Sequence, residues 1–228
     1  MSVCCRILLS NVIFNRIKQH LVVSVAPGMN DSNPVTFTVT SQPLPNPWLD
    51  QDVGAVGVAG SASFSNGTFT VNGAGGQIYG TADAFHFVYQ PLTGDGSIVA
   101  RLVSLQGGSG FVSAGVMIRE TLNAGSTNAK TADWRTYGGI YFDVRTTTGG
   151  STTEPGSLTV TLPYWVKVTR SGSSFTSYTS LDGVTWVQLG TSATISMAPN
   201  VLVGLAVNSG STSALATATF DNVSIASP

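Results

Sequence analysis

The stretch FHFVYQPLTGDGSIVARLVSLQGGSGFVSAGVMIRE, residues 85–120, indicates how this chain folds. Residues 85–90 alternate between the two faces of a strand, and 98–105 and 114–120 are further apolar runs of strand length. Glycine-rich segments at 94–96 and 107–110 separate the three runs and predict turns. The stretch therefore predicts three consecutive short strands.

The same pattern of short strands and turns continues from Trp48 to the end of the chain. Asp182-Gly183 is a hairpin signal, and no segment shows a convincing helical period of 3.6 residues or an internal repeat. About ten strands at this spacing predict an all-β protein, as a two-sheet antiparallel sandwich or a barrel. The further strands are expected at 139–145, 164–170, 175–180, 186–189, 201–208 and 216–225.

Composition narrows the classes of function. Only 9% of the 228 residues are charged, against about 25% in an average domain, whereas 42% are hydrophobic. A net charge of −1 without basic runs argues against nucleic-acid binding, and no apolar run approaches the length of a membrane span. Cys4 and Cys5 are adjacent, so we expect no disulfide in the folded body. A surface made polar by Ser, Thr, Asn and Gly favours a secreted or cell-surface protein.

The first 47 residues differ from the rest. Residues 1–20 hold both cysteines and share no composition with the neighbouring segment, so they form an atypical stretch that is native or artefactual. Residues 21–47 contain the alternating string SNPVTFTV at 32–39 and a linker with three prolines. The string resembles the last strand of bacterial IPT/TIG-type immunoglobulin-like domains. That resemblance implies an Ig-like fragment, and a chain that is part of a longer multidomain protein.

Four motifs carry a second resemblance, and they occur in the order WLDQDVGAVG (48–57), GVMIRE (115–120), SLDGVTW (180–186) and TFDNVS (219–224). Together they resemble jelly-roll modules of the concanavalin A-like lectin/glucanase superfamily of bacterial surface and secreted proteins. The resemblance covers roughly residues 48–226, so we expect a domain at 48–228, and it implies two curved antiparallel sheets with one concave face. The superfamily contains lectins, carbohydrate-binding modules, glycosidases and polysaccharide lyases, so it does not by itself select a function.

A candidate binding stripe lies on the strand 139–145. Alternation places Tyr141, Asp143 and Arg145 on the face opposite Ile140, Phe142 and Val144, and an aromatic ring, an acid and a guanidinium on one face suit a sugar. Arg119 on a neighbouring strand is a further candidate ligand-binding residue. The structural interpretation is that Arg119 or Arg145 pairs with Asp143 or Glu120 across strands and holds the register.

Trp134 and Tyr137 are the candidate aromatic anchors, because sugar rings stack on flat aromatic faces. Both lie in the polar stretch 123–138, which we interpret as a mobile loop. The alternative is that Trp134 folds back over the edge of the sandwich as a hydrophobic lid.

Catalytic and metal-binding groups are scarce. Glu120 and Glu154 are the only glutamates, and they lack the Glu-x-Asp-x-x-Glu spacing of the superfamily's retaining glucanases. His86 is interpreted as a hydrogen-bonded strand residue. No cofactor is required. The resemblance implies an optional structural Ca²⁺, for which Asp50, Asp52 and Asp221 are the candidate ligands, although turn-capping aspartates would look the same.

The sequence thus predicts a non-catalytic carbohydrate-binding or adhesion module, whose partner is an oligo- or polysaccharide held on the concave sheet face. One alternative is a glycoside hydrolase or polysaccharide lyase that uses Glu120 and Asp143 as its acid/base pair. A second alternative is a structural spacer without a ligand.

Overall fold

The computed structural model describes residues 7–8, 18–23, 37–40 and 43–227, which contain strands and no helix. No helix able to cross a membrane is therefore found among them. The chain divides into two compact units, Met1–Pro43 and Leu44–Pro228. In the first, β1 (Ile7–Leu8), β2 (Lys18–Val23) and β3 (Phe37–Thr40) form a three-stranded antiparallel sheet. Both cysteines and most of the predicted Ig-like string lie outside the described residues.

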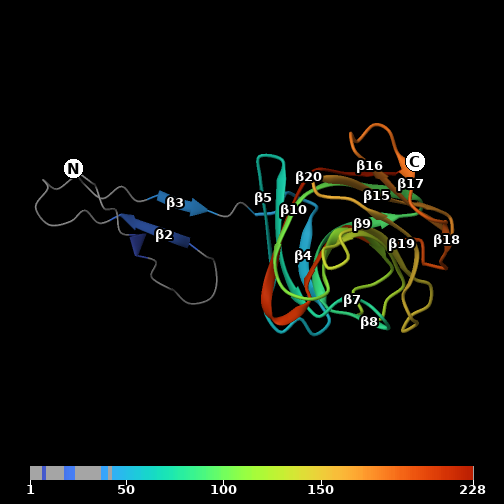
Figure 1. Cartoon of the computed structure of the whole chain (residues 1–228), viewed down its shortest axis with the longest axis horizontal. Coiled ribbons are helices and arrows are strands. Elements are labelled where there is room, and N and C mark those ends of the chain that lie inside the picture. The colour runs from blue at the N-terminus through green and yellow to red at the C-terminus, as the bar shows by residue number, and fades with distance from the viewer. Residues whose placement is uncertain (1–6, 9–17, 24–36, 41–42, 228) are drawn as a thin grey trace, which may run out of the picture. The chain divides into compact units, whose positions relative to one another are not determined.

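The second unit is a sandwich of two antiparallel sheets, which confirms the predicted fold class (Figure 1). The seven-stranded sheet has the order β14-β13-β12-β11-β19-β9-β4. Its strands are β4 (Leu49–Val53), β9 (Phe85–Thr93), β11 (Val112–Arg119), β12 (Asn128–Trp134), β13 (Gly139–Arg145), β14 (Thr153–Thr159) and β19 (Asn200–Ser209).

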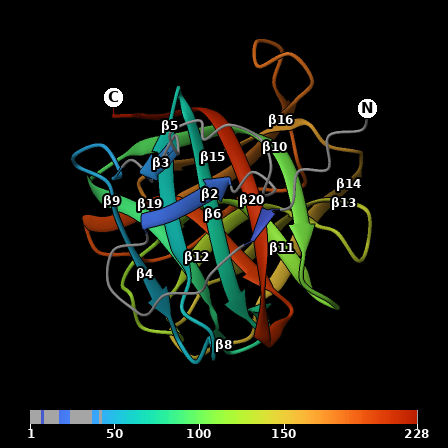
Figure 2. The same ribbon diagram turned by 90° about the vertical axis from the view of Figure 1, so that its left-hand side faces the viewer.

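The eight-stranded sheet has the order β17-β16-β15-β10-β20-β6-β5, with β18 paired to β16. In Figure 2, β6, β20 and β10 can be followed next to one another. The strands are β5 (Ser61–Ser65), β6 (Thr68–Gly75), β10 (Gly96–Gly107), β15 (Tyr164–Ser171), β16 (Ser174–Ser180), β17 (Val187–Gln188), β18 (Ala193–Thr194) and β20 (Ser211–Ala226).

The main core lies between the sheets and is built by period-2 alternation. Ile140, Phe142 and Val144 of β13 point into it, as the sequence predicted, and they meet side chains such as Val166 and Phe220 of the other sheet. The alternate residues of β13 therefore lie on the side of the seven-stranded sheet that is turned away from the eight-stranded sheet. We call this side the outer face.

The outer face carries a second, smaller core. It consists of Val53, Ile78, Phe85, Phe87, Tyr89, Met117 and Ala206. Ile78 comes from a short ribbon of two strands, β7 (Ile78–Tyr79) and β8 (Ala82–Asp83), which lie together beside the sandwich (Figure 1). Through this core the ribbon packs on β9, β11 and β19, and it also contacts Lys130 of β12 and Arg145 of β13, so it covers part of the outer face.

The predicted loop 123–138 is wrong over seven of its sixteen residues. Residues 128–134 form β12, which pairs with β11 and β13 and is buried at every position. The sequence NAKTADW does not read as a strand, because it holds few β-branched or aromatic residues and the buried Lys130 relies on the Ile78 carbonyl, a partner far away in the chain. Trp134 is the last residue of β12 and is 4% exposed, so it is not an anchor in a mobile loop.

Candidate functional site

A pocket of about 440 Å³ opens on the uncovered part of the outer face. It is within the size range of small-molecule sites in proteins. Five aromatic rings, one amide and two carboxylates line it, from β7, the turn before β11, the β12–β13 hairpin and β14. These residues are Gln77, Tyr79, Phe111, Trp134, Tyr137, Tyr141, Asp143 and Glu154.

The aromatic side chains of the pocket support one another around Trp134. The ring of Trp134 meets those of Tyr79, Phe111 and Tyr137 at centroid distances of 5.9, 6.3 and 6.2 Å, mostly edge to face. Tyr137 in turn lies 6.0 Å from Tyr141. Edge-on contacts of this kind leave aromatic faces available to a ligand. Tyr137 and Phe111 are 56% and 45% exposed, so they form an accessible rim above the buried Trp134.

Asp143 lies almost fully buried at the base of the pocket. Its Oδ2 accepts a hydrogen bond of 2.7 Å from the indole N–H of Trp134 and lies 3.1 Å from the Lys130 ammonium, directly across the β12–β13 pairing. Its Oδ1 is buried and has no hydrogen-bond partner among the described residues. An unpaired buried acceptor is costly, so this atom is the strongest local indication of a missing donor.

Lys130 belongs to the support of the pocket and does not line it. The side chain is completely buried, and its ammonium also donates to the Ile78 carbonyl at 3.1 Å and lies 4.5 Å from the centre of the Trp134 ring. Burial lowers the pKa of Lys130, and the charge of Asp143 opposes that shift. Lys130 therefore fixes both the acid and the indole in place.

The structure brings four of the predicted binding residues into this pocket, namely Trp134, Tyr137, Tyr141 and Asp143. Sequence reasoning missed the other four, Gln77, Tyr79, Phe111 and Glu154. A usable signal existed for two of them, because Tyr79 precedes Gly80 and Phe111 follows Gly110. An aromatic residue next to a turn glycine is often exposed, which is unfavourable unless the ring is used.

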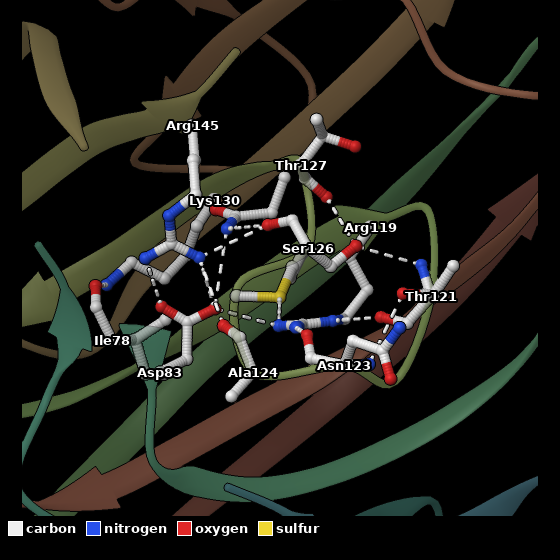
Figure 3. A network of polar contacts seen from close by, with 12 residues as sticks. Ile78, Asp83, Arg119, Thr121, Asn123, Ala124, Ser126, Thr127, Lys130 and Arg145 are labelled. Atoms are coloured by element: carbon white, nitrogen blue, oxygen red, sulfur yellow. Dashed lines mark hydrogen bonds and ion pairs between the residues drawn. The ribbon is translucent and has the colours of Figure 1, made fainter. Parts of the chain in front are cut away.

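Arg119 and Arg145, also predicted to bind ligand, do not reach the pocket. Both are fully buried and converge on Asp83 of β8 (Figure 3). Arg145 donates to the two carboxylate oxygens of Asp83 at 2.6 and 2.8 Å, and Arg119 donates to Oδ2 at 3.1 Å. The prediction that Arg119 or Arg145 pairs with Asp143 or Glu120 is thus wrong. Their partner, Asp83, lies in a ribbon that the sequence did not reveal.

Main-chain carbonyl groups complete the surroundings of the two arginines. Arg119 donates to the carbonyls of Thr121 and Asn123 at 2.6 Å each, and its guanidinium lies 5.1 Å from the centre of the Phe85 ring. Arg145 donates to the carbonyls of Gly80 and Gly150 at 3.1 Å. Burial lowers the pKa of Arg119, and the charge of Asp83 partly offsets this shift. The cluster ties the ribbon that carries Tyr79 to the sheet, so it positions the pocket without touching a ligand.

The predicted acid/base pair is not assembled. Glu120 does not line the pocket, and its carboxylate accepts hydrogen bonds from the Thr127 hydroxyl at 3.0 Å and the Ala198 main-chain N–H at 2.9 Å. It follows Arg119 directly, so alternation turns it away from the outer face. Glu154 is the glutamate that shares the pocket with Asp143.

The three candidate calcium ligands are not gathered either. Asp221 accepts two hydrogen bonds from Arg101 within the eight-stranded sheet, whereas Asp50 and Asp52 belong to β4 of the other sheet. Their carboxylates hold the two ring nitrogens of His86, at 3.1 Å from Nε2 and 2.8 Å from Nδ1. Within the part of the chain that the structure describes, no three His, Cys, Asp or Glu side chains are placed to hold a metal ion.

His86 is hydrogen-bonded, and its surroundings favour its protonated form. Burial, the largest single influence, lowers its pKa, but the hydrogen bonds and charges of Asp50 and Asp52 together outweigh it, so the pKa lies above its ordinary value of 6.5. The imidazolium can donate to both carboxylates at once. It therefore joins the edge strand β4 to β9.

Comparisons with solved structures find the same β-sandwich fold in other proteins. No family model matches the sequence, and no curated protein does. A functionally unknown protein from Saccharomyces cerevisiae superposes with a TM-score of 0.58 at 18% identity, over 74% of this chain and 92% of that one. The GH43 protein BlXynB (K247S mutant) from Bacillus licheniformis also gives 0.58, at 16% identity, over 74% of this chain and 35% of the enzyme.

Carbohydrate-binding module CBM66 from Bacillus subtilis has nearly the same extent as the sandwich. It superposes with a TM-score of 0.51 at 17% identity, over 79% of this chain and 95% of the module. At these identities the likeness concerns the fold, which is the jelly-roll sandwich expected from the sequence. No comparison supports the resemblance to an Ig-like domain, which stays a prediction.

Replacing Asp83 by Asn is expected to destabilise the sandwich by about 3–5 kcal/mol, because two buried guanidinium groups lose their counter-charge. Urea unfolding measures the change. The control is Asp221→Asn, which breaks the partly exposed pair with Arg101 and should cost about 0–1 kcal/mol. Equal costs for the two variants would contradict the structural role given to the Asp83 cluster.

The His86 cluster predicts a pH dependence of stability. A pKa raised by folding means that the stabilisation is complete below the unfolded value of about 6.5 and is lost as the pH rises through the folded value. The free energy of unfolding should therefore fall above about pH 6.5 in the wild type, and His86→Gln should flatten that fall. Urea unfolding between pH 5 and pH 9 tests this, and equal slopes in both proteins would refute it.

Proposed function

We propose that the sandwich formed by residues 44–228 is a carbohydrate-binding module that holds a glycan in the aromatic pocket of its outer face. The observation that carries the proposal is the combination of five aromatic rings with the unpaired Oδ1 of Asp143. Sugar rings present apolar C–H faces to aromatic rings and hydroxyl donors to such an acceptor. Few precisely placed polar groups among apolar walls are typical of ligand sites.

The fold and the composition support the same class of function. The similar structures include a carbohydrate-binding module and a GH43 protein. A surface with few charged residues is typical of proteins that act outside the cell. We therefore infer a secreted or surface-attached module of a larger protein. The module CBM66 is about as long as the sandwich, which agrees with this inference.

A glycoside hydrolase is the second candidate, because Asp143 and Glu154 line one pocket. Hydrolysis of a glycosidic bond needs two carboxyl groups on either side of it. In this arrangement, however, Lys130 and Trp134 hold Asp143 through one oxygen. Such contacts suit a fixed acceptor better than a group that exchanges protons in each turnover.

A glycan array combined with a reducing-sugar release assay separates these functions. Binding without release supports the module. Release that Glu154→Gln abolishes would establish the hydrolase instead. If the protein neither binds nor releases any sugar, it is a structural spacer and the proposal is wrong.

Tyr137→Ala is expected to weaken glycan binding about tenfold, which corresponds to about 1.4 kcal/mol. Tyr137 is exposed at the rim, so its loss should leave the free energy of unfolding nearly unchanged. Calorimetric titration with the best ligand from the array measures the affinity. Trp186→Ala is the control, because it removes an aromatic ring that packs against Trp165 and does not line the pocket. An unchanged affinity for Tyr137→Ala would exclude the rim as a contact.

A further inference from the structure

The charges around the pocket restrict which sugars it can accept. Its lining contains two carboxylates, Asp143 and Glu154, and no basic side chain. Lys130 offsets the charge of Asp143 from behind, where it is buried and held by Asp143, the Ile78 carbonyl and the Trp134 ring. Glu154 is exposed on β14 and has no such counter-charge among the contacts of the described residues. The pocket therefore presents a net negative charge to its ligand.

The carboxylates also act on two of the three tyrosines that line the pocket, Tyr79 and Tyr141. Burial raises the pKa of the Tyr79 phenol, and the charges of Asp143 and Glu154 raise it further. Burial also raises the pKa of Tyr141, followed by the charge of Glu154 and then smaller contributions that include Asp143. A field that opposes ionisation of two phenols also opposes the entry of a carboxylate, so uronic and sialic acids are unfavourable ligands.

The aromatic faces favour a cationic ligand, as the carboxylates do. A cation over the face of a Trp, Tyr or Phe ring is attracted by the negative charge of that face, and the attraction grows when water is excluded. Five rings surround this pocket, and the Lys130 ammonium already uses the lower side of Trp134. A positively charged group on the ligand would meet rings on several sides and a free carboxylate at the edge.

The unpaired oxygen of Asp143 distinguishes between kinds of cation. Oδ1 lacks a hydrogen-bond donor, and this acceptor is buried. A primary ammonium group supplies N–H donors and charge together, whereas a quaternary ammonium group supplies charge alone and would leave Oδ1 unpaired. Among sugars, the primary ammonium is carried by amino sugars whose nitrogen is not acetylated.

We propose that the pocket selects a glycan containing unacetylated amino sugar, whose ammonium group is attracted by Glu154 and the aromatic faces and donates to the buried Asp143 Oδ1 once the rim side chains have moved aside. This inference rests on the proposed function, because it names the sugar class for the same pocket. The ligand is a glucosamine-type residue in an oligo- or polysaccharide.

Three β-1,4-linked oligosaccharides of equal length test the proposal by calorimetric titration of the full chain at pH 6 and low salt. Their units are glucosamine, N-acetylglucosamine and glucose. The glucosamine oligomer should bind about tenfold more tightly than the other two, a preference that corresponds to a single favourable charged contact. The preference should shrink at high salt, because screening weakens the attraction to the exposed Glu154.

Glu154→Gln and Glu120→Gln form a matched pair of variants, since these are the only two glutamates. Glu154→Gln should remove most of the preference for glucosamine, so that the glucosamine and glucose oligomers then bind with similar affinity. Glu120→Gln makes the same change of charge outside the pocket and should keep the preference. The two variants also control for folding, because a general loss of structure would lower all affinities together.

The outcomes separate this inference from the proposed function. Equal affinities for the three oligomers, or a preference for the acetylated or the neutral one, overturn the amino-sugar assignment and leave the glycan-binding module standing. An N-trimethylated glucosamine oligomer that binds as tightly as the free amine would also overturn it, because no donor would then be needed. If none of the three oligomers binds and the glycan array shows no binding either, both proposals are overturned.

Discussion

The buried charge of Asp83 is the constraint on which the outer face of the sandwich depends. A two-residue strand such as β8 has no stability of its own, yet its carboxylate is the counter-charge of two fully buried arginines from β11 and β13. Neither guanidinium can remain in this interior without it. These ion pairs therefore tie the ribbon to the sheet and place Tyr79 at the pocket.

Two buried aspartates on the outer face show how a structural carboxylate differs from a candidate site. Asp83 uses both oxygens with Arg119 and Arg145, and nothing remains for a ligand. Asp143 also has a buried cation, Lys130, but that cation and Trp134 share one oxygen and leave the other unpaired. Burial and ion pairing alone do not mark a site. The unsatisfied acceptor beside open aromatic rings does.

Local alternation sufficed to predict the sandwich and the face of β13 that carries Tyr141 and Asp143. It could not reveal the partner of the arginines, because Asp83 is 36 residues from Arg119 and 62 from Arg145. It also missed β12, whose buried Lys130 relies on the distant Ile78 carbonyl. Sequence patterns report which face a side chain takes, whereas pairing between distant residues decides whether that face is packed or open.

The way in which the pocket is held together favours recognition over turnover. Lys130 and Trp134 fix the Asp143 carboxylate in one orientation, and the rings around Trp134 brace one another. The entropy of ordering these groups is lost when the protein folds, so a ligand does not have to order them again. Tyr137 and Phe111 at the rim are the most exposed of the five rings, so they can adjust most easily. A rigid base with an adjustable rim discriminates between ligands by the donors they bring to the base, because the base cannot rearrange to accept a ligand that lacks them.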